Sequence, residues 1–291
     1  DFKKSNIDNY SHPYTAGLYS SYNKSPAMKY LSSMALCLFV FIFVPPVLNA
    51  QNELAAAFVC PPCGDGSCDS QTYDQAGQCP HCGMNLIAKR NRLTVAIFLY
   101  DGVEILDFSG PGEVFAASRP NKGGFRVYTV AATKDPLVSQ GFVHIQPEYS
   151  IHDCPKPDII VLPGGNSGPS VDNDDVIRWV QEVEPDLTAA LSVCTGAFIL
   201  ERAGLLVGKK ATTFHNAIES LREKATETEV LEHTRWVDNG KIITTAGVSA
   251  GIDGALHLVA RIYGLETAKA TAFYMEYDKW NPEEGVVVEG N

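Results

Sequence analysis

The stretch LSVCTGAF, residues 191–198, places a single cysteine, Cys194, between an apolar run and a glycine. A thiol at a sharp turn from a strand into a helix is held clear of the sheet, and the positive end of the helix favours its anion. Gly196 would relieve crowding at such a turn. These residues predict a cysteine nucleophile with an acidic thiol; the alternative is an inert cysteine buried in a core.

Two other side chains could move protons for such a thiol. Asp107 lies in an otherwise apolar stretch, YDGVEILDFSGP, and could share a proton with Cys194 or act as a general acid or base on water. The alternative for Asp107 is a helix-capping interaction. His215, after the segment ATTF, could orient or deprotonate the thiol, although a histidine early in a helix is often only a satisfied polar residue. Glu104 is a second candidate for the role of Asp107, but it is expected to face solvent.

Backbone groups near the cysteine could stabilise a developing negative charge. The N–H groups of Thr195 and of the Gly164 and Gly165 turn are candidates for an oxyanion hole. The glycine turn ends a predicted buried strand, 157–165. Cys194, this turn and the segment after Leu99 therefore all fall at the carboxyl ends of predicted strands, where parallel sheets carry their functional crevice.

The segments between these residues alternate between strand and helix patterns. Apolar runs rich in branched residues predict buried strands, and glycine or proline marks helix ends. The predicted strands are 93–99, 125–132, 157–165 and 187–193, the predicted helices are 110–118, 195–206, 216–224 and 249–264, and a hairpin covers 234–247. This order predicts an α/β fold with a doubly wound, mostly parallel sheet and a nucleophile elbow, over about residues 92–280.

Two Cys-x2-Cys pairs precede this domain. Cys60 and Cys63 form the first pair, Cys79 and Cys82 the second, and 15 residues separate them. Such pairs are typical of zinc ribbons, because each turn points two thiolates at one tetrahedral ion. About 30 residues cannot build an adequate core alone, so a metal would supply the folding energy. Residues 58–88 are therefore predicted to be a module that binds zinc or another heavy metal.

Other residues of the module leave its chemistry open. Cys68 and His81 could exchange into the site or favour a softer ion such as Cu(I). A disulfide staple in an oxidising compartment is the alternative to a metal. Met84 is expected to pack rather than to bind the ion.

The first 50 residues differ in composition from the rest. Residues 28–50 combine one lysine, an apolar run and small residues up to Ala50, as in a secretory signal peptide. The run is too short to cross a bilayer comfortably, so we expect no stable membrane span after cleavage; an uncleaved anchor is the alternative. Residues 1–27 are polar and are expected to be a leader or an over-extended reading frame. The mature protein is expected to be periplasmic or secreted.

The net charge limits the classes of partner that we expect. The chain carries 34 acidic and 23 basic residues, a formal net charge of −11. Nucleic acid and anionic lipid are therefore not expected as partners.

The motif Gly247-Val-Ser-Ala-Gly251 matches a serine-hydrolase elbow, but the residues that would complete that mechanism lie on the same predicted helix. We expect Ser249 to be a helix N-cap.

These motifs, in this order, resemble the ThiJ/PfpI superfamily, whose fold is that of class I glutamine amidotransferases. The carriers are VAIFLYDGVEILDFSGPGEVF, DIIVLPGG, SVCTGAFILERAGLLVGKKATT and RWVDNGKIITTAGVSAGIDGALHLVARIYG. The piece GQCPHCGMNLI resembles short heavy-metal-binding modules, although the first pair departs from their pattern. The resemblance implies a nucleophile at Cys194, a carboxylate at Asp107 and an oxyanion turn at Gly164 and Gly165.

The residue pattern at the elbow is most similar to isonitrile hydratase-like members of that superfamily. They use a cysteine, the threonine after it and an aspartate, here Cys194, Thr195 and Asp107, to add water to R–N≡C. Many relatives have histidine directly after TT, where this chain has Phe214. Relatives fused to helix-turn-helix regulators exist, but no DNA-binding module is expected here.

The resemblance implies a thiol-dependent hydratase or hydrolase that acts on a small electrophilic substrate, needs no cofactor for catalysis and forms a homodimer. One alternative is glyoxalase or deglycase chemistry on reactive aldehydes. The other is a non-catalytic metal or redox stress sensor, in which a thiol is oxidised rather than turned over.

Overall fold

The computed structural model describes residues 58–60, 71–88, 92–120 and 123–289. The expected leader (1–27) and signal peptide (28–50), together with Cys63 and Cys68, lie outside the described residues. Within the described ranges, no helix has both the length and the apolar content needed to cross a bilayer.

A single large sheet organises the main domain. In the described part of the chain it has eight strands, in the order β15-β13-β14-β10-β9-β4-β5-β8. In that order their bounds are Val286–Val287, Trp236–Asn239, Ile242–Thr245, Ala189–Val193, Ile159–Leu162, Leu93–Leu99, Phe125–Ala131 and Tyr149–Ser150. Every neighbouring pair is parallel except β13 and β14. The predicted mostly parallel sheet is confirmed.

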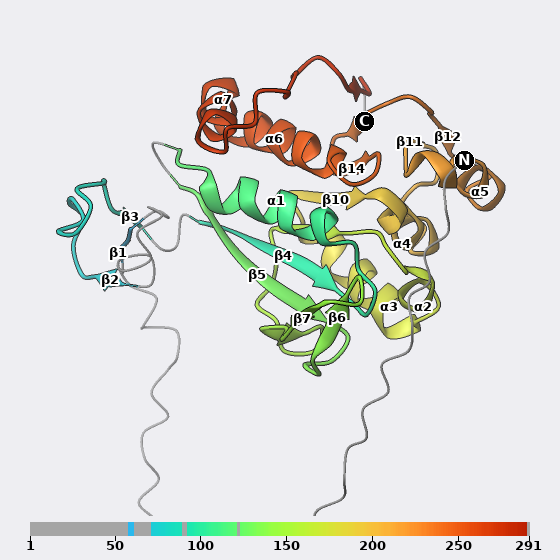
Figure 1. The fold of residues 1–291 in the computed structure, drawn as a ribbon, viewed down its shortest axis with the longest axis horizontal. Coiled ribbons are helices and arrows are strands. Elements are labelled where there is room, and N and C mark those ends of the chain that lie inside the picture. The colour runs from blue at the N-terminus through green and yellow to red at the C-terminus, as the bar shows by residue number, and fades with distance from the viewer. Residues whose placement is uncertain (1–57, 61–70, 89–91, 121–122, 290–291) are drawn as a thin grey trace, which may run out of the picture. The chain divides into compact units, whose positions relative to one another are not determined.

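Helices cover both faces of this sheet (Figure 1), because its central strands are apolar on both sides. One face packs against α1 (Ile105–Ala117), α6 (Ala250–Tyr263) and α7 (Leu265–Tyr274). The other face packs against α2 (Gly168–Val171), α3 (Asp174–Val183), α4 (Ala197–Arg202) and α5 (Ile218–Lys224). This is the doubly wound arrangement that the alternating sequence pattern predicts.

Two small sheets and three short helical turns complete the domain. The antiparallel sheet pairs β6 (Leu137–Ser139) with β7 (Val143–Ile145), and the parallel one pairs β11 (Lys210–Ala211) with β12 (Glu229–Val230). The 3-10 turns are η2 (Glu184–Asp186), η3 (Cys194–Gly196) and η4 (His215–Ala217).

Two helix boundaries differ from the sequence-based prediction. Helix α1 begins at Ile105, not near residue 110, so Pro111 lies inside the helix. Burial of this turn, where α1 packs against α6, outweighs the preference of proline for a first helical position. Helix α4 ends at Arg202 rather than near residue 206, because Gly204 already adopts a left-handed φ of 76°.

In the C-terminal half the predicted hairpin and the helix after Ser249 are confirmed, whereas α7 and the short strands β11, β12 and β15 were not predicted. Strands β13 and β14 form the expected antiparallel hairpin, and Gly240 in its turn has a φ of 80°. Helix α6 begins directly after Ser249 and ends at Gly264. The Ser249 side chain makes no capping hydrogen bond; its hydroxyl instead accepts one from Arg235, at 3.3 Å. Ser249 is thus the N-cap by position only.

The cysteine-rich module has its own small sheet. Strands β1 (Phe58–Val59), β2 (Thr72–Tyr73) and β3 (Ile87–Ala88) are antiparallel, in the order β2-β1-β3. Its described core is small, with the buried Cys60 and Cys79 at the centre.

Candidate functional site

Cys194 sits where β10 ends and the chain turns into η3 and α4. Its φ of 58° is left-handed, which costs a non-glycine residue on the order of 1–3 kcal/mol and is characteristic of functional turns. Two backbone contacts fix it: the Cys194 N–H donates to Ala246 O at 3.1 Å, and its carbonyl accepts from Thr213 Oγ1 at 2.7 Å. A Cβ on Gly196 would come within 1.9 Å of the Leu162 carbonyl oxygen, so the tight elbow needs glycine there.

Asp107 lies in the first turn of α1, fully buried. Its Oδ2 accepts a hydrogen bond from Gly164 N at 2.9 Å, and its Oδ1 accepts one from Val248 N at 3.0 Å. Both donors come from other segments, and the N-cap of α1 is Glu104. The helix-capping alternative is therefore wrong, because the carboxyl group connects α1 to the turn after β9 and to the segment before α6.

The Cys194 thiol and the Asp107 carboxyl interact directly. Burial, followed by the charge of Asp107, raises the pKa of Cys194 to about 12. Burial also raises the pKa of Asp107 to about 7, although hydrogen bonds from the backbone lower it in part. The predicted acidic thiol is wrong, since burial and a neighbouring carboxylate outweigh the turn's dipole. Near neutral pH the pair therefore holds at most one negative charge, on Asp107, which is partly ionised there.

The glycine turn after β9 lies against this pair. The Gly164 N–H donates to Asp107, and the Gly165 N–H donates to Thr195 Oγ1 at 3.1 Å. The Thr195 N–H lies toward the Cys194 sulfur and lowers its pKa in part. These N–H groups already have hydrogen-bond partners inside the protein. To stabilise an oxyanion they would have to leave those partners during the reaction, so the oxyanion hole stays a prediction. The turn's observed role is to fix the thiol and the carboxyl together.

His215 does not join the pair. It is exposed at the start of η4, and its ring lies 4.2 Å from that of Phe214, centroid to centroid. Among the described contacts, no hydrogen bond links His215 to Cys194. The candidate role as base for the thiol is therefore not supported by the geometry.

Sequence reasoning missed Tyr100, and it expected Glu104 to face solvent. Tyr100, directly after β4, donates from its hydroxyl to Pro163 O at 2.8 Å; burial and then the charges of Asp107 and Cys194 raise its pKa. Glu104 is half-buried rather than solvent-facing, and its charge raises the pKa of both Asp107 and Cys194. Tyr100 could have been found from the sequence, because it directly follows the carboxyl end of a predicted strand.

A second chemical centre is the cysteine cluster of the N-terminal module. The sulfur atoms of Cys60, Cys79 and Cys82 all lie within 4.8 Å of one another, and Cys60 Sγ is 3.3 Å from Cys82 Sγ. Cys79 and Cys82 are free thiols, so neither of them forms the alternative disulfide staple. Three soft donors converging on one point fit a thiophilic metal ion. Cys63 lies outside the described residues.

Neighbouring side chains tune this cluster. Burial acts to raise the pKa of Cys79, but hydrogen bonds from the Tyr73 hydroxyl and from backbone N–H groups lower it to about 6. Tyr73 Oη is 3.4 Å from Cys79 Sγ. His81 points instead to Gln71, at 3.1 Å, and does not belong to the cluster. Met84 packs beside it, as expected.

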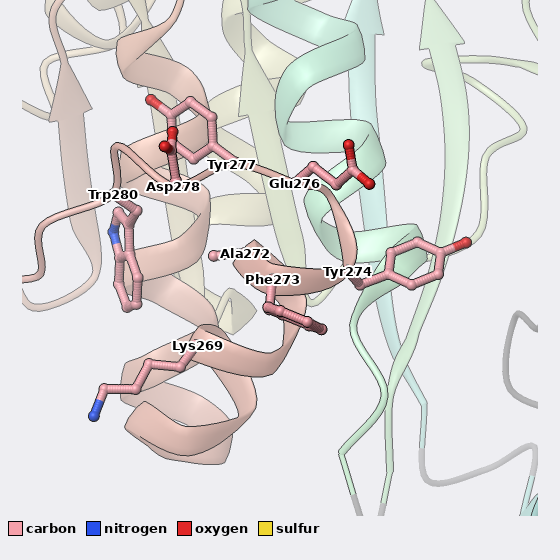
Figure 2. Close-up of a pocket in the computed structure, with 8 residues that line it drawn as sticks. All are labelled: Lys269, Ala272, Phe273, Tyr274, Glu276, Tyr277, Asp278 and Trp280. Carbon is pink, nitrogen blue, oxygen red and sulfur yellow. The ribbon is translucent and has the colours of Figure 1, made fainter.

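A groove of about 700 Å³ lies beside the end of α7 (Figure 2). Trp280 and Phe273 frame it over Ala272, with Asp278 and Lys269 at opposite ends in this view. None of the candidate catalytic residues lines it, so its size alone does not make it the reaction site.

Comparisons with known proteins agree with both centres. The model of the DJ-1/PfpI family matches residues 93–261, and that of the heavy metal binding domain matches residues 57–89. An isonitrile hydratase from Pseudomonas putida is 32% identical over 189 residues, which cover 64% of this chain and 78% of that protein.

Solved structures give the same fold. A ThiJ/PfpI family protein from Pseudomonas syringae has a TM-score of 0.59 at 28% identity, covering 66% of this chain and 77% of its own. Drosophila melanogaster DJ-1beta has a TM-score of 0.56 at 20% identity, covering 64% and 98%, and shows the fold alone. The chain therefore belongs to the DJ-1/PfpI family and carries a heavy metal binding domain ahead of its family domain.

Proposed function

We propose that the family domain is a cysteine-dependent hydratase of the isonitrile hydratase type. The observation that carries the proposal is the buried pairing of the Cys194 thiol with the Asp107 carboxyl at a left-handed elbow. The similarity to an isonitrile hydratase over most of that protein's length supports this choice of substrate. Thr195, directly after the nucleophile, completes the expected set.

The pKa values of the pair suit base-assisted attack. A thiol with a pKa of about 12 is protonated at neutral pH, so it needs a base at the moment of attack. A carboxyl group with a pKa of about 7 is partly ionised there and is well matched to accept that proton and return it.

In the proposed first step, the Cys194 thiol gives its proton to the Asp107 carboxylate, and the sulfur forms a bond to the terminal carbon of R–N≡C. The proton then passes from Asp107 to that carbon, which leaves a thioimidate, R–N=CH–S–Cys194. Thr195 holds the glycine turn in place through its hydroxyl.

In the second step, water adds to the same carbon, its hydroxyl to carbon and its proton, by way of Asp107, to nitrogen. The C–S bond breaks as the hydroxyl proton returns to sulfur. One isonitrile and one water are consumed, one N-substituted formamide, R–NH–CHO, is released, and the thiol is restored.

The test is formamide production by the full chain. Wild type and Cys194→Ser are incubated with an isonitrile, and separately with methylglyoxal, and products are followed by NMR. Formamide from the wild type and none from the variant supports the proposal. Turnover of methylglyoxal alone would replace it with aldehyde chemistry, and no thiol-dependent turnover of either would leave the sensor alternative. The raised pKa of Cys194 argues against a readily oxidised sensor thiol.

For the N-terminal module we propose that zinc or another heavy metal is held by Cys60, Cys79 and Cys82, with Cys63 as the fourth ligand. A tightly bound ion supplies folding energy to a segment with little core of its own. We assign it no step in the hydration reaction. A homodimer and a location outside the cytoplasm, the latter from residues 28–50, complete the proposal.

A further inference from the structure

The Phe214 ring lies close to the Cys194 sulfur. A Cβ built on Gly247 would meet Phe214 Cδ2 at 2.5 Å and Cys194 Sγ at 3.3 Å. Both atoms therefore lie close to the same position, the one that a Gly247 side chain would occupy. The edge of the Phe214 ring is thus near the Cys194 sulfur. Phe214 is half-buried, and no polar group on its side chain competes for the thiol proton.

A cavity of about 350 Å³ lies beside the backbone on either side of Phe214, although the Phe214 ring does not line it. It is lined by the residues on either side of Phe214, namely Thr213 and His215, and by Ala246, which precedes Gly247. Thr213 and Ala246 are the two residues that hold the Cys194 backbone, at 2.7 Å and 3.1 Å. Neither Cys194 nor Phe214 lines this cavity, and its lining includes Glu232, His233 and Arg235, so it is a space distinct from the surroundings of the sulfur.

We propose that Phe214 is a specificity-determining residue, an apolar wall beside the Cys194 sulfur that limits the isonitrile's N-substituent to small apolar groups. This inference rests on the proposed hydratase function. The ring supplies an apolar surface for the substituent, while the charges that act on the Cys194 thiol, those of Asp107 and Glu104, are both acidic and disfavour anionic substituents.

The substitution Phe214→Ala removes the ring edge beside the Cys194 sulfur and leaves room there for a larger substituent. We expect the ratio of kcat/KM for 2-naphthyl isonitrile to that for methyl isonitrile to rise by about tenfold or more, the scale expected when a pocket gains room for a bulky group. The gain should appear mainly in KM for the bulky substrate. The matched control is Phe273→Ala, because this exposed ring lines the separate groove of Figure 2. There the ratio should stay within about twofold.

A second measurement does not depend on isonitrile turnover. The rate of Cys194 alkylation by iodoacetamide and by a pyrenyl maleimide is followed by peptide mass spectrometry at fixed pH. Phe214→Ala should raise the rate of the bulky reagent relative to the small one; Phe214→Leu, which preserves most of the packing, should give a smaller rise in the same direction.

The outcomes separate the two proposals. If the wild type hydrates neither isonitrile, the hydratase function fails, and an increased bulky-to-small alkylation ratio would still support the wall. If the wild type hydrates methyl isonitrile and both ratios are unchanged in folded Phe214→Ala and Phe214→Leu, the hydratase stands and the role of Phe214 is overturned. A changed ratio in Phe273→Ala instead would place the substituent in the other groove.

Discussion

Cys79 and Cys194 are both buried thiols, yet their surroundings move their pKa values in opposite directions. Hydrogen bonds from Tyr73 and the backbone lower the pKa of Cys79 to about 6, whereas burial and Asp107 raise that of Cys194 to about 12. The first thiol gives up its proton at neutral pH without help. The second keeps its proton until a base removes it.

The difference teaches what each site is suited to do. A thiolate that is already ionised and lies beside two other thiols can bind a cation without first giving its own proton to an acceptor at the site. A protonated thiol paired with one carboxyl can transfer its proton and form a covalent bond only when an electrophile arrives. Burial alone therefore does not identify a reactive cysteine; its hydrogen-bond donors and neighbouring charges do.

The largest effect should follow Cys194→Ala. Removing the nucleophile should lower turnover by on the order of 10³-fold or more, while metal content per chain stays unchanged. Steady-state kinetics and metal analysis on the same sample measure the loss of turnover at Cys194 and the retention of metal by the N-terminal module. Wild-type activity in the variant would remove Cys194 from the reaction.

Asp107→Asn should lower kcat/KM by on the order of 10²-fold, because an amide cannot accept the thiol proton. In the wild type, kcat/KM should rise with pH and level off above about 7, as the carboxyl group becomes ionised. This rise should be absent in the variant. A wild-type profile that falls across the same range would show that the protonated carboxyl is the active form.

The raised pKa of Asp107 also makes a prediction about stability. The folded state binds the Asp107 proton more tightly than the unfolded state, whose pKa is near 3.8, so this group contributes stability that is present below pH 4. The contribution should be lost as the pH rises to about 7 and should not change further above it. Urea unfolding at several pH values, with Asp107→Asn as reference, measures this difference.

Gly164→Ala tests whether the glycine turn fixes the pair. The new Cβ would meet Thr195 N at 2.6 Å, Cys194 Cβ at 2.7 Å and Asp107 Oδ2 at 2.8 Å. We expect a loss of about 1–3 kcal/mol in the free energy of unfolding and at least a tenfold loss of turnover. Gly168→Ala is the matched control, since a Cβ there meets nothing within 4 Å. Equal behaviour of the two variants would contradict a positioning role for Gly164.

The smallest effect on turnover should come from the metal module. Cys79→Ser should abolish stoichiometric binding of zinc or another heavy metal, and should unfold the segment around β1 to β3. Turnover by the Cys194 site should change by less than about twofold, because no step of the proposed reaction uses the ion. A large loss of activity on chelation of the wild type would show that the two centres are coupled.

The sheet was predictable because its signals are local. The apolar run at 93–99 gave the exact bounds of β4, and Asp238-Asn239-Gly240 marked the hairpin turn. The start of α1 and the end of α4 were not predictable from proline and glycine alone. There, packing between distant segments and the left-handed Gly204 decide the boundary.

The sequence predicted which residues form the site, but it did not predict their pKa values. Cys194 and Asp107 both lie at carboxyl ends of strands, so topology brings them together. The donors to Asp107 lie 57 and 141 residues away along the chain, and no sequence pattern reports such contacts. The sign of the Cys194 pKa shift depends on burial and on that carboxylate, and so it could only come from the structure.

The two hydrogen bonds that Asp107 accepts have a consequence for redesign. The carboxyl group connects α1, the turn after β9 and the start of α6, so a substitution at this position alters loop geometry along with proton transfer. The bulky surface beside the thiol is supplied by Phe214, which makes no such connection through its side chain. A laboratory that wants new substrates from this scaffold should therefore randomise position 214 and leave position 107 fixed.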